Sequence, residues 1–531
     1  MLIDARTIPE GKEINVDLCV IGGGPAGISV ALPFLDSSTR TVAVLESGGL
    51  DFNEKAQDLA DATSSGHHYF IMKETRIRAF GGTTMSWGGI NAPLDSLDFK
   101  KRAWVPYSGW PISREDLDPY YTEAKRVSKV FDPDASSAGS GGYFGDDYGP
   151  TPSTRWPEMF LSAPARFGQV YAEPFKQAAN VSTYLYSTGI ELETNDSQAA
   201  ITGLRVASLD GSSFRMVARN YVLAGGGIEN ARLLLASGDR DAGGIGNEHD
   251  LVGRFFQEHP GVMDRFWLPA DATELASHVS GATGTLNFSR LGLSDTAQAD
   301  EELLNYIVNL SFGYSGQQTD QFQAVRRIVN ASMKPWSDSP YFQDVGGGPN
   351  AVRWEDIKTA LKKPHRSFQG AFGAKFEPAR MRRWIQIETN VEQIPSPDNR
   401  VTLASDTDGF GVPRAHLQWN LSDEEERTYR RGLELVVEAL DQYSPGLWDR
   451  RMDYPDPWPG EVTANWHHIG TTRMHTDPSQ GVVDANCRVH GIANLYAAGS
   501  SVFPTGGATS PTLTIVALGL RLAEHLKAHN G

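Results

Sequence analysis

Cysteine is almost absent from this chain, since only Cys19 and Cys487 occur among its 531 residues. Two cysteines this far apart cannot form a disulfide framework, and they cannot supply the four thiolates of an iron–sulfur cluster. Both classes of protein are therefore excluded. Cys19 lies within an apolar run that we expect to form a buried strand.

Positive charge is also scarce, because 48 Lys and Arg face 65 Asp and Glu, giving a formal net charge of −17. This balance repels nucleic-acid backbones and anionic lipid surfaces, so we expect neither as a partner. No apolar run approaches the ~18–20 residues of a membrane-spanning helix, and the chain shows no leader pattern or lipidation motif. We therefore expect a soluble, cytoplasmic protein.

The chain is long enough, and apolar enough at 40% hydrophobic residues, for two joined domains. Residues 17–21, 28–35 and 41–45 predict a β-α-β unit and hence a parallel sheet. More pieces of the same domain are predicted far along the chain: strands at 219–223 and 495–498, and helices at 230–236 and 511–527. The first domain is therefore expected to be discontinuous.

The region from about residue 265 to 455 has a different character. Alternating apolar and polar residues, as at 384–388 and 400–403, predict antiparallel strands over which a substrate could sit. A helix is predicted at 422–440, because acidic residues in its first turn suit the helix dipole. Glycine-rich loops are expected at 136–142 and 345–350. No internal repeat is found.

Three glycines follow the first predicted strand. Gly22 suits a tight turn, Gly24 lets the backbone approach a pyrophosphate, and Gly27 allows close packing of strand and helix. Glu46 ends the second strand about twenty residues later, where a carboxylate can accept ribose hydroxyls. An acidic residue there favours FAD or NAD over NADP.

A second glycine-rich loop follows at residues 78–89. Its glycine pairs suit backbone amides packed against a flat ring, although a purely structural loop is the alternative. The candidate cofactor contacts in it are Gly81, Gly82, Thr83, Trp87 and Gly88.

Near the other end of the chain, His467 precedes a glycine-spaced strand and a helix opened by Ser510, Pro511 and Thr512. Flavin-dependent alcohol oxidation needs a base and a helix N-terminus on one side of an isoalloxazine ring. The two ends of the sequence therefore predict one site. The histidines lack the spacing of zinc ligands, so we expect no metal.

In order along the chain, these motifs resemble the glucose–methanol–choline (GMC) oxidoreductase family, near its bacterial pyranose-oxidase-like branch. The resemblance spans the chain and is vaguest over 265–455. It rests on FGGTT at 80–84, WGG at 87–89, the stretch 93–113 ending in SGWPIS, AGGGIENARLL at 224–234, residues 252–260, and the segment 467–526.

The resemblance implies an α/β plus α+β fold, in which a Rossmann-like FAD-binding domain is joined to a discontinuous substrate domain built on an antiparallel sheet. The FAD-binding domain is expected at 1–110, 195–264 and 456–531, and the substrate domain with its loops at 111–194 and 265–455. The implied activity is oxidation of a CH–OH group in a sugar, glycoside or other secondary alcohol. The electron acceptor, oxygen or another, and the oligomeric state are left open.

The resemblance also assigns roles within the C-terminal segment. His467 matches the family's catalytic histidine, which takes the hydroxyl proton while hydride leaves for flavin N5; its neighbour His468 is expected to be structural. Gly499 and Ser500 should approach the ribityl chain. Pro511 and Thr512 open a helix whose N-terminus should face the flavin N1–C2=O edge.

Two residues depart from the family pattern. Ser510 stands where a second histidine or an asparagine is usual, and its hydroxyl is shorter and cannot hold a charge at neutral pH. Ser86 stands where some relatives carry the histidine that bonds covalently to the flavin, so we expect non-covalent FAD.

Two alternatives stay open. Because of Ser510, the chemistry could be that of a lyase, a decarboxylase or a natural-product tailoring enzyme on the same scaffold. The chain could also be a non-catalytic binding protein with a vestigial site, against which the intact Gly22, Glu46 and His467 argue.

Overall fold

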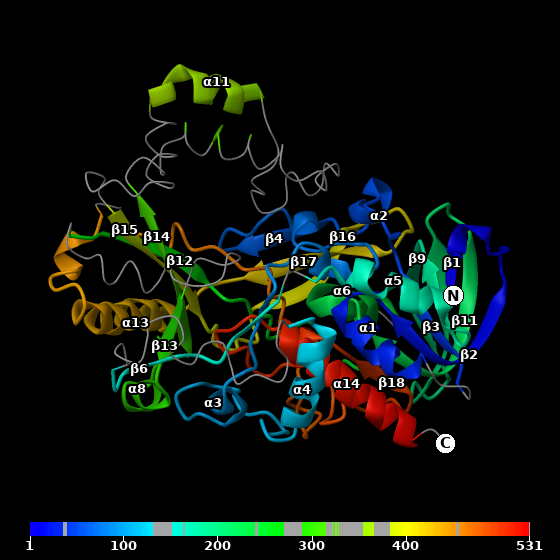
Figure 1. Ribbon diagram of the computed structural model, residues 1–531. Helices are drawn as coiled ribbons and strands as arrows, with labels where there is room; N and C mark the ends of the chain where they lie inside the picture. The colour runs from blue at the N-terminus through cyan, green and yellow to red at the C-terminus, as the bar shows by residue number, and fades with distance from the viewer. Residues whose placement is uncertain are drawn as a thin grey trace.

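The computed structural model describes residues 1–35, 40–130, 151–162, 165–238, 243–269, 289–314, 321, 324–325, 328, 354–365, 383–452 and 456–529. The loops predicted at 136–142 and 345–350 lie outside the described residues. Two main sheets organise what is described, each with its own hydrophobic core (Figure 1). Both ends of the chain lie beside the larger sheet.

The larger sheet has eight strands, in the order β1-β8-β3-β2-β11-β10-β9, with β18 also paired to β11. Its central strands are parallel, and residues 18–21 and 42–46 are buried, as apolar strands covered on both faces should be. This confirms the predicted β-α-β unit and the late strand. The bounds are β1 Leu2–Asp4, β2 Glu13–Ile21, β3 Val42–Glu46, β8 Val181–Leu185, β9 Ser187–Thr194, β10 Ile201–Ser208, β11 Ser213–Leu223 and β18 Leu495–Ala497.

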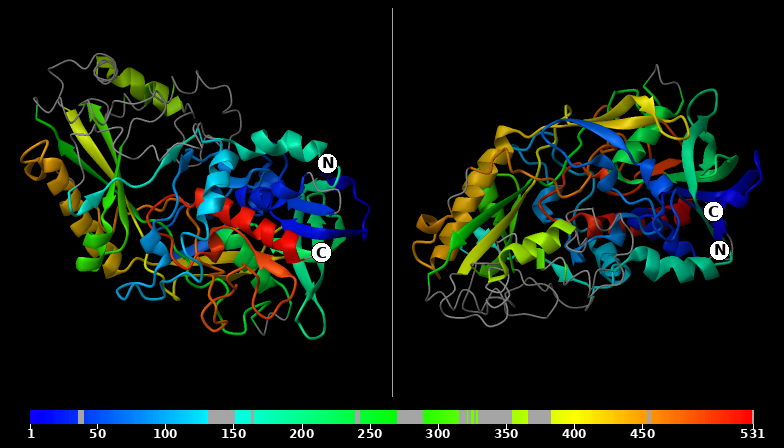
Figure 2. Two further views of the ribbon diagram at one scale, coloured as in Figure 1. Left: turned by 60° about the horizontal axis from the view of Figure 1, so that its bottom comes forward. Right: turned by 90° about the horizontal axis from the view of Figure 1, so that it is seen from above.

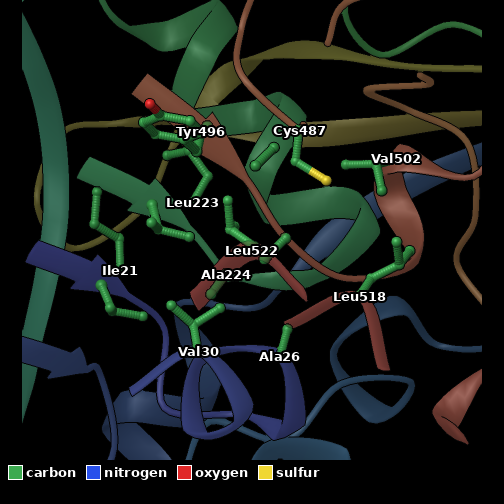
Figure 3. Close-up of a cluster of buried hydrophobic side chains, with 14 of the residues drawn as sticks. Ile21, Ala26, Val30, Leu223, Ala224, Cys487, Tyr496, Val502, Leu518 and Leu522 are labelled. Carbon is green, nitrogen blue, oxygen red and sulfur yellow. The ribbon is translucent and has the colours of Figure 1, made fainter. Parts of the chain in front are cut away.

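Helices from opposite ends of the chain meet beside this sheet. Helix α1 (Pro25–Ala31) follows β2 and packs against α14 (Thr512–His529), which also contacts α4 (Asp118–Val127). Figure 3 shows Ala26 and Val30 of α1 gathered with apolar side chains of α14 and of the strand ends. This packing brings the first glycine turn and the start of the last helix together.

The second sheet is antiparallel, in the order β12-β15-β14-β13-β6. Helix α13 (Asp423–Asp441) covers one face of it (Figure 2) and packs there through apolar residues. A reciprocal capping box between Ser422 and Glu425 starts that helix. The predicted antiparallel sheet and helix are confirmed. The bounds are β6 Thr154–Arg155, β12 Gly261–Trp267, β13 Ser289–Leu293, β14 Tyr306–Tyr314 and β15 Arg383–Val391.

Residues 400–403 form an antiparallel strand as predicted, but in a different sheet from residues 384–388. They lie in β16 (Arg400–Thr407), which pairs with β17 (Pro413–Trp419). β17 pairs in turn with β4 (Ala62–Gly66), and this small sheet packs on α6 (Gly226–Ala236) of the nucleotide side. Alternation reveals a half-buried strand but not its partner, so the sequence could not distinguish the two sheets.

The remaining elements are short or peripheral. Within the part of the chain that the structure describes, no helix is both long and apolar enough to cross a bilayer. The bounds are α2 Glu54–Asp58, β5 Ile90–Asn91, α3 Ser96–Phe99, β7 Phe160–Leu161, α5 Phe167–Gln177, α8 Asp295–Asp300 and α11 Trp354–Lys362.

Candidate active site

A cavity of about 440 Å³ opens at the carboxyl ends of β2, β3 and β11 and reaches the segment that carries His467. It joins the two ends of the chain, as the sequence predicted, although the roles of its residues stay predictions. The predicted residues that line it are Gly22, Gly24, Glu46, Gly82, Thr83, Trp87, Gly88, His467, Gly499, Ser500, Ser510, Pro511 and Thr512.

The glycine turn has the geometry that its spacing predicted. Gly22 has φ +121°, and a Cβ there would lie 2.4 Å from the Ala224 carbonyl oxygen. A Cβ on Gly27 would lie 1.9 Å from the Gly22 oxygen, so α1 approaches β2 only because this residue is glycine. Gly24 differs, because the nearest atom to a Cβ on it would be Cα of Gly82, at 3.7 Å. The space on this side of Gly24 belongs to the cavity.

Gly81 does not line the cavity, contrary to the prediction. It has φ +101°, and a Cβ would lie 2.3 Å from the backbone nitrogen of Gly168. Its role in the structure is therefore close backbone packing against α5, while Gly82 next to it faces the cavity.

Glu46 is buried, with 5% of its surface exposed, at the cavity wall. One carboxylate oxygen accepts the Gly23 amide at 3.0 Å, and the other accepts the Gly48 amide at 2.8 Å. Burial raises the pKa of this carboxyl despite these hydrogen bonds. Oε1, which accepts the Gly48 amide, also accepts the Ser47 hydroxyl at 3.3 Å, so Oε2 is the oxygen that keeps a lone pair for a ligand hydroxyl.

His467 is paired with a second histidine that the sequence analysis did not single out. Its Nδ1 lies 2.7 Å from Nδ1 of His259, and Nε2 of His259 lies 3.3 Å from the Gly506 carbonyl oxygen. Burial lowers the pKa of His259 to about 4 and that of His467 well below 6.5, so both rings are neutral at pH 7.

This chain of hydrogen bonds assigns the tautomers. A carbonyl only accepts, so Nε2 of His259 carries its proton and donates to Gly506. Nδ1 of His259 is then an acceptor, and Nδ1 of His467 must be the donor. The lone pair of His467 therefore sits on Nε2, and the ring that bears it lines the cavity.

Glu258 anchors the backbone on which His467 sits. Its carboxylate accepts the backbone amides of His467 at 3.0 Å and Asn465 at 3.2 Å, and the hydroxyl of Tyr69. Burial raises the pKa of Glu258 to about 7, although these donors oppose the shift. The carboxylate therefore fixes the segment that carries His467.

His468 lies in different surroundings from His467. Its ring is 5.9 Å from that of Phe256 and 6.3 Å from that of Tyr69, and burial lowers its pKa to about 3. Its Nε2 is buried and has no hydrogen-bond partner among the described residues. The two imidazoles therefore have different neighbours, yet both line the cavity.

Arg290 of β13, which the sequence analysis missed, lies near the site, although it is not among the residues that line the cavity. It is 4% exposed, its Nη1 donates to Thr509 Oγ1 at 3.2 Å, and burial lowers its pKa to about 10. Glu388 and Asp95 only partly oppose this lowering, and the charge of Arg290 lowers the pKa of both His467 and His259. A cation thus lies beside the turn that ends in Ser510.

Arg290 belongs to a polar row across the antiparallel sheet. It pairs in register with Asn309, which pairs with Glu388. Nε of Arg290 donates to the Asn309 side chain at 2.8 Å. Neighbouring residues of these strands point to the opposite face, where they pack with α13. The face without that helix is therefore polar.

A buried ion cluster lines the cavity near Glu46. Burial opposes ionisation of Glu229, but the guanidinium groups of Arg78, Arg232 and Arg76 hold its pKa at about 2. Arg78 lies 2.8 Å and Arg76 2.9 Å from its carboxylate. The helical motif that contains Glu229 was recognised in the sequence, but its ion partners were not.

Metal chemistry finds no support in the described residues, where no group of three or more His, Cys, Asp or Glu side chains could hold an ion. Both cysteines are buried and free. His259 carried one sequence signal, the His259–Pro260 pair of the family resemblance, whereas Arg290 carried none.

Comparison with known proteins agrees with this architecture. Residues 395–519 match the family model described as GMC oxidoreductase. The chain is 24% identical to the fructose dehydrogenase large subunit of Gluconobacter japonicus, over 85% of this chain and 81% of that protein. It is 36% identical to the C-glycoside 3-oxidase of Microbacterium trichothecenolyticum, over 25% of each chain.

A solved structure of formate oxidase superposes with a TM-score of 0.57 at 18% identity, covering 98% of this chain and 99% of that one. At this identity the likeness concerns the fold. These matches agree with the resemblance to the GMC oxidoreductase family that the sequence motifs indicated. The placement of the chain near the pyranose-oxidase-like branch stays a prediction.

Proposed function

We propose that this protein is an FAD-dependent oxidoreductase that oxidises a CH–OH group of a sugar, a glycoside or another secondary alcohol. His467 Nε2 takes the hydroxyl proton. The observation that carries the proposal is the hydrogen-bond chain from Gly506 through His259 to His467, because it leaves a neutral imidazole lone pair at the cavity.

The residues present fit FAD. Gly24 leaves space where a side chain would intrude, and Oε2 of Glu46 at the end of β3 keeps a lone pair for a ribose hydroxyl. Gly82, Thr83 and the start of α14 would hold the ring system from both sides. When bound, FAD supplies the acceptor for the hydride that leaves the alcohol carbon. Ser86 offers no imidazole for a covalent link, so the proposal includes non-covalent binding.

The protein's own contribution is to bind, orient and deprotonate the alcohol. Glu258 fixes the backbone of His467, and His259 fixes its tautomer. Arg290 supplies a cation near Ser510, whose side chain is shorter than the histidine or asparagine usual at that position. This cation can stabilise negative charge that develops on the substrate oxygen. This compensation favours alcohol oxidation over the lyase or decarboxylase alternative that Ser510 raised.

The test is anaerobic titration of the yellow protein with alcohols, monosaccharides and glycosides. Bleaching by one class, with a ketone or aldehyde as product, is the expected result; a product with no two-electron change would refute the proposal. His467→Asn should abolish bleaching. His416→Asn, at a histidine bound to Thr63 and Ser65 on the separate small sheet, is the control. Admission of air then identifies the acceptor, and release of the yellow colour on denaturation tests non-covalent binding.

A further inference from the structure

A second cavity, of about 320 Å³, lies between residues 101–111 and residues 473–480. It shares no described lining residue with the cavity at His467. The alcohol chemistry proposed above therefore does not account for it. Its lining includes the side chains of Lys101, Tyr107, Arg473 and His475.

The wall of this cavity contains a buried cation without a counter-charge. Arg473 is 2% exposed, and its only side-chain hydrogen bond among the described residues runs from Nη2 to the Tyr107 carbonyl at 2.6 Å. Its Nε and Nη1 are buried without a partner. Burial lowers its pKa to about 10, with no carboxylate near enough to oppose the shift. A buried guanidinium normally has a charged or fully hydrogen-bonded partner, so this one has donors to spare.

Two aromatic rings hold the guanidinium in place. Its central carbon lies 4.5 Å from the ring of Phe255 and 5.9 Å from that of Tyr107. Both aromatic residues have φ +59°, a left-handed backbone conformation that bulky side chains rarely adopt. Such conformations persist where the surrounding structure requires them and concentrate at binding sites. The rings cover the guanidinium but satisfy none of its N–H groups.

The other polar groups of the cavity are donors too. Nδ1 of His475 accepts the Asp477 amide at 2.9 Å, so its neutral ring carries the proton on Nε2. Lys101 contributes an ammonium and Gln480 an amide, and none of the described lining residues is acidic. The charge of this lining is therefore positive, opposite in sign to the net charge of −17 of the whole chain. Positive donors gathered around one cavity select an anion.

We propose that this cavity is a binding site for a small oxyanion, the carboxylate or phosphate group of a metabolite, attracted by the uncompensated charge of the Arg473 guanidinium in its wall. Lys101 and His475 supply hydrogen-bond donors. The site is separate from that of the alcohol, so it stands whether or not the proposed oxidation is correct.

Isothermal titration calorimetry on the intact, flavin-loaded protein tests the site with two probes, inorganic phosphate and acetate, at constant ionic strength in NaCl. We expect saturable one-site binding of at least one probe and a rise in melting temperature with its concentration. Tighter binding of phosphate indicates the phosphate group of a metabolite as the ligand, and tighter binding of acetate indicates a carboxylate group. Absence of saturable binding by both probes would overturn the proposal.

Three variants locate the binding. Arg473→Met should abolish it, and Lys101→Glu should weaken it by about tenfold through loss of a charged donor. Lys100→Glu makes the same charge change next door, at an exposed residue outside the lining, and should leave affinity unchanged. If Arg473→Met does not fold, the comparison of Lys101→Glu with Lys100→Glu decides. Equal affinity in these two lysine variants contradicts the assignment.

Discussion

Nδ1 of His467 lies 2.7 Å from Nδ1 of His259, although 208 positions separate the two residues in the sequence. The pair is formed where the end of the segment 252–260 meets the C-terminal segment. His259 in turn donates to Gly506, which lies between His467 and α14. The tautomer of the proposed base is therefore set by tertiary structure rather than by its own motif.

Replacement of His259 should slow the proposed reaction, while the glycines that line the cavity stay unchanged. In His259→Phe, Nδ1 of His467 loses its acceptor, so the proton can move to Nε2 and block the base. We expect the anaerobic reduction rate to fall about tenfold to a hundredfold, with flavin content preserved. His259→Gln, whose amide oxygen can accept from Nδ1–H, should recover part of the rate. A His259→Phe variant as fast as the parent protein would show that the tautomer is fixed by other means.

The pH dependence of the same rate follows from the pKa of His467. Burial, with smaller contributions from His259, His468 and Arg290, lowers that pKa well below 6.5. A general base works when neutral, so lowering the pH toward 6 should not protonate it. Stopped-flow reduction should therefore stay flat from about pH 8 to pH 6, whereas an unperturbed imidazole would lose half its base form near pH 6.5. A half-loss at or above pH 6.5 contradicts the assigned environment.

Stability should respond to pH through the buried histidines. His468 has a pKa of about 3 when folded, against about 6.5 when unfolded, so the unfolded state binds more protons below pH 6.5. This lowers the free energy of unfolding by up to about 1.4 kcal/mol per pH unit as pH falls from 6.5 toward 4.

The matched variant for this effect is His468→Phe, which removes one titrating group from a site already bordered by Phe256 and Tyr69. In urea unfolding at pH 7, 6 and 5, the free energy of unfolding of the parent should fall more steeply with decreasing pH than that of the variant. Glu258 acts in the opposite direction, because its folded pKa of about 7 is raised and its contribution fades as pH rises from about 4.5. It is common to both proteins, so the difference isolates His468. Parallel curves would refute the shift.

The sequence predicted the parts of the site that depend on short-range patterns. Gly22, Gly24 and Gly27 act within one turn, and Glu46 follows from the length of a β-α-β unit. The start of α14 was also predictable, because a proline and a capping residue mark it locally. Each of these signals lies within a few dozen residues of the structure that it specifies.

What the sequence did not predict depends on contacts between distant segments. Arg290 reaches Thr509 across 219 positions, and its place is set by sheet register rather than by a motif. The choice of strand partner also depends on distant segments. Residues 400–403 pair with β17, which pairs in turn with β4, and they do not join the substrate sheet. The close packing of Gly81 was missed for a similar reason, since the backbone that it approaches, Gly168, comes from a separate helix.

Arg290 should matter for substrate binding and for the acid limit of the reaction. Arg290→Gln removes the cation beside Thr509, so the KM for the alcohol should rise and the reduction rate should fall by about tenfold or more. Because Arg290 lowers the pKa of His467, its loss should also move the acid limb of the rate profile to higher pH. Arg290→Lys keeps the charge and should keep that limb in place. A limb that does not move in Arg290→Gln argues that the charge is too remote to act on His467.

Alanine substitutions at Gly24 and Gly27, the two glycines at the start of α1, should have different effects. A Cβ on Gly27 would lie 1.9 Å from the Gly22 oxygen and 3.2 Å from Val20, so Gly27→Ala must displace α1 and should cost about 3 kcal/mol or more of unfolding free energy. A Cβ on Gly24 meets only Gly82, at 3.7 Å, on the side that lines the cavity. Gly24→Ala should therefore fold with nearly unchanged stability but release FAD more readily, measured as flavin fluorescence on dilution. If instead Gly24→Ala keeps its flavin while losing stability, this side of the turn is a packing surface and the cofactor lies elsewhere in the cavity.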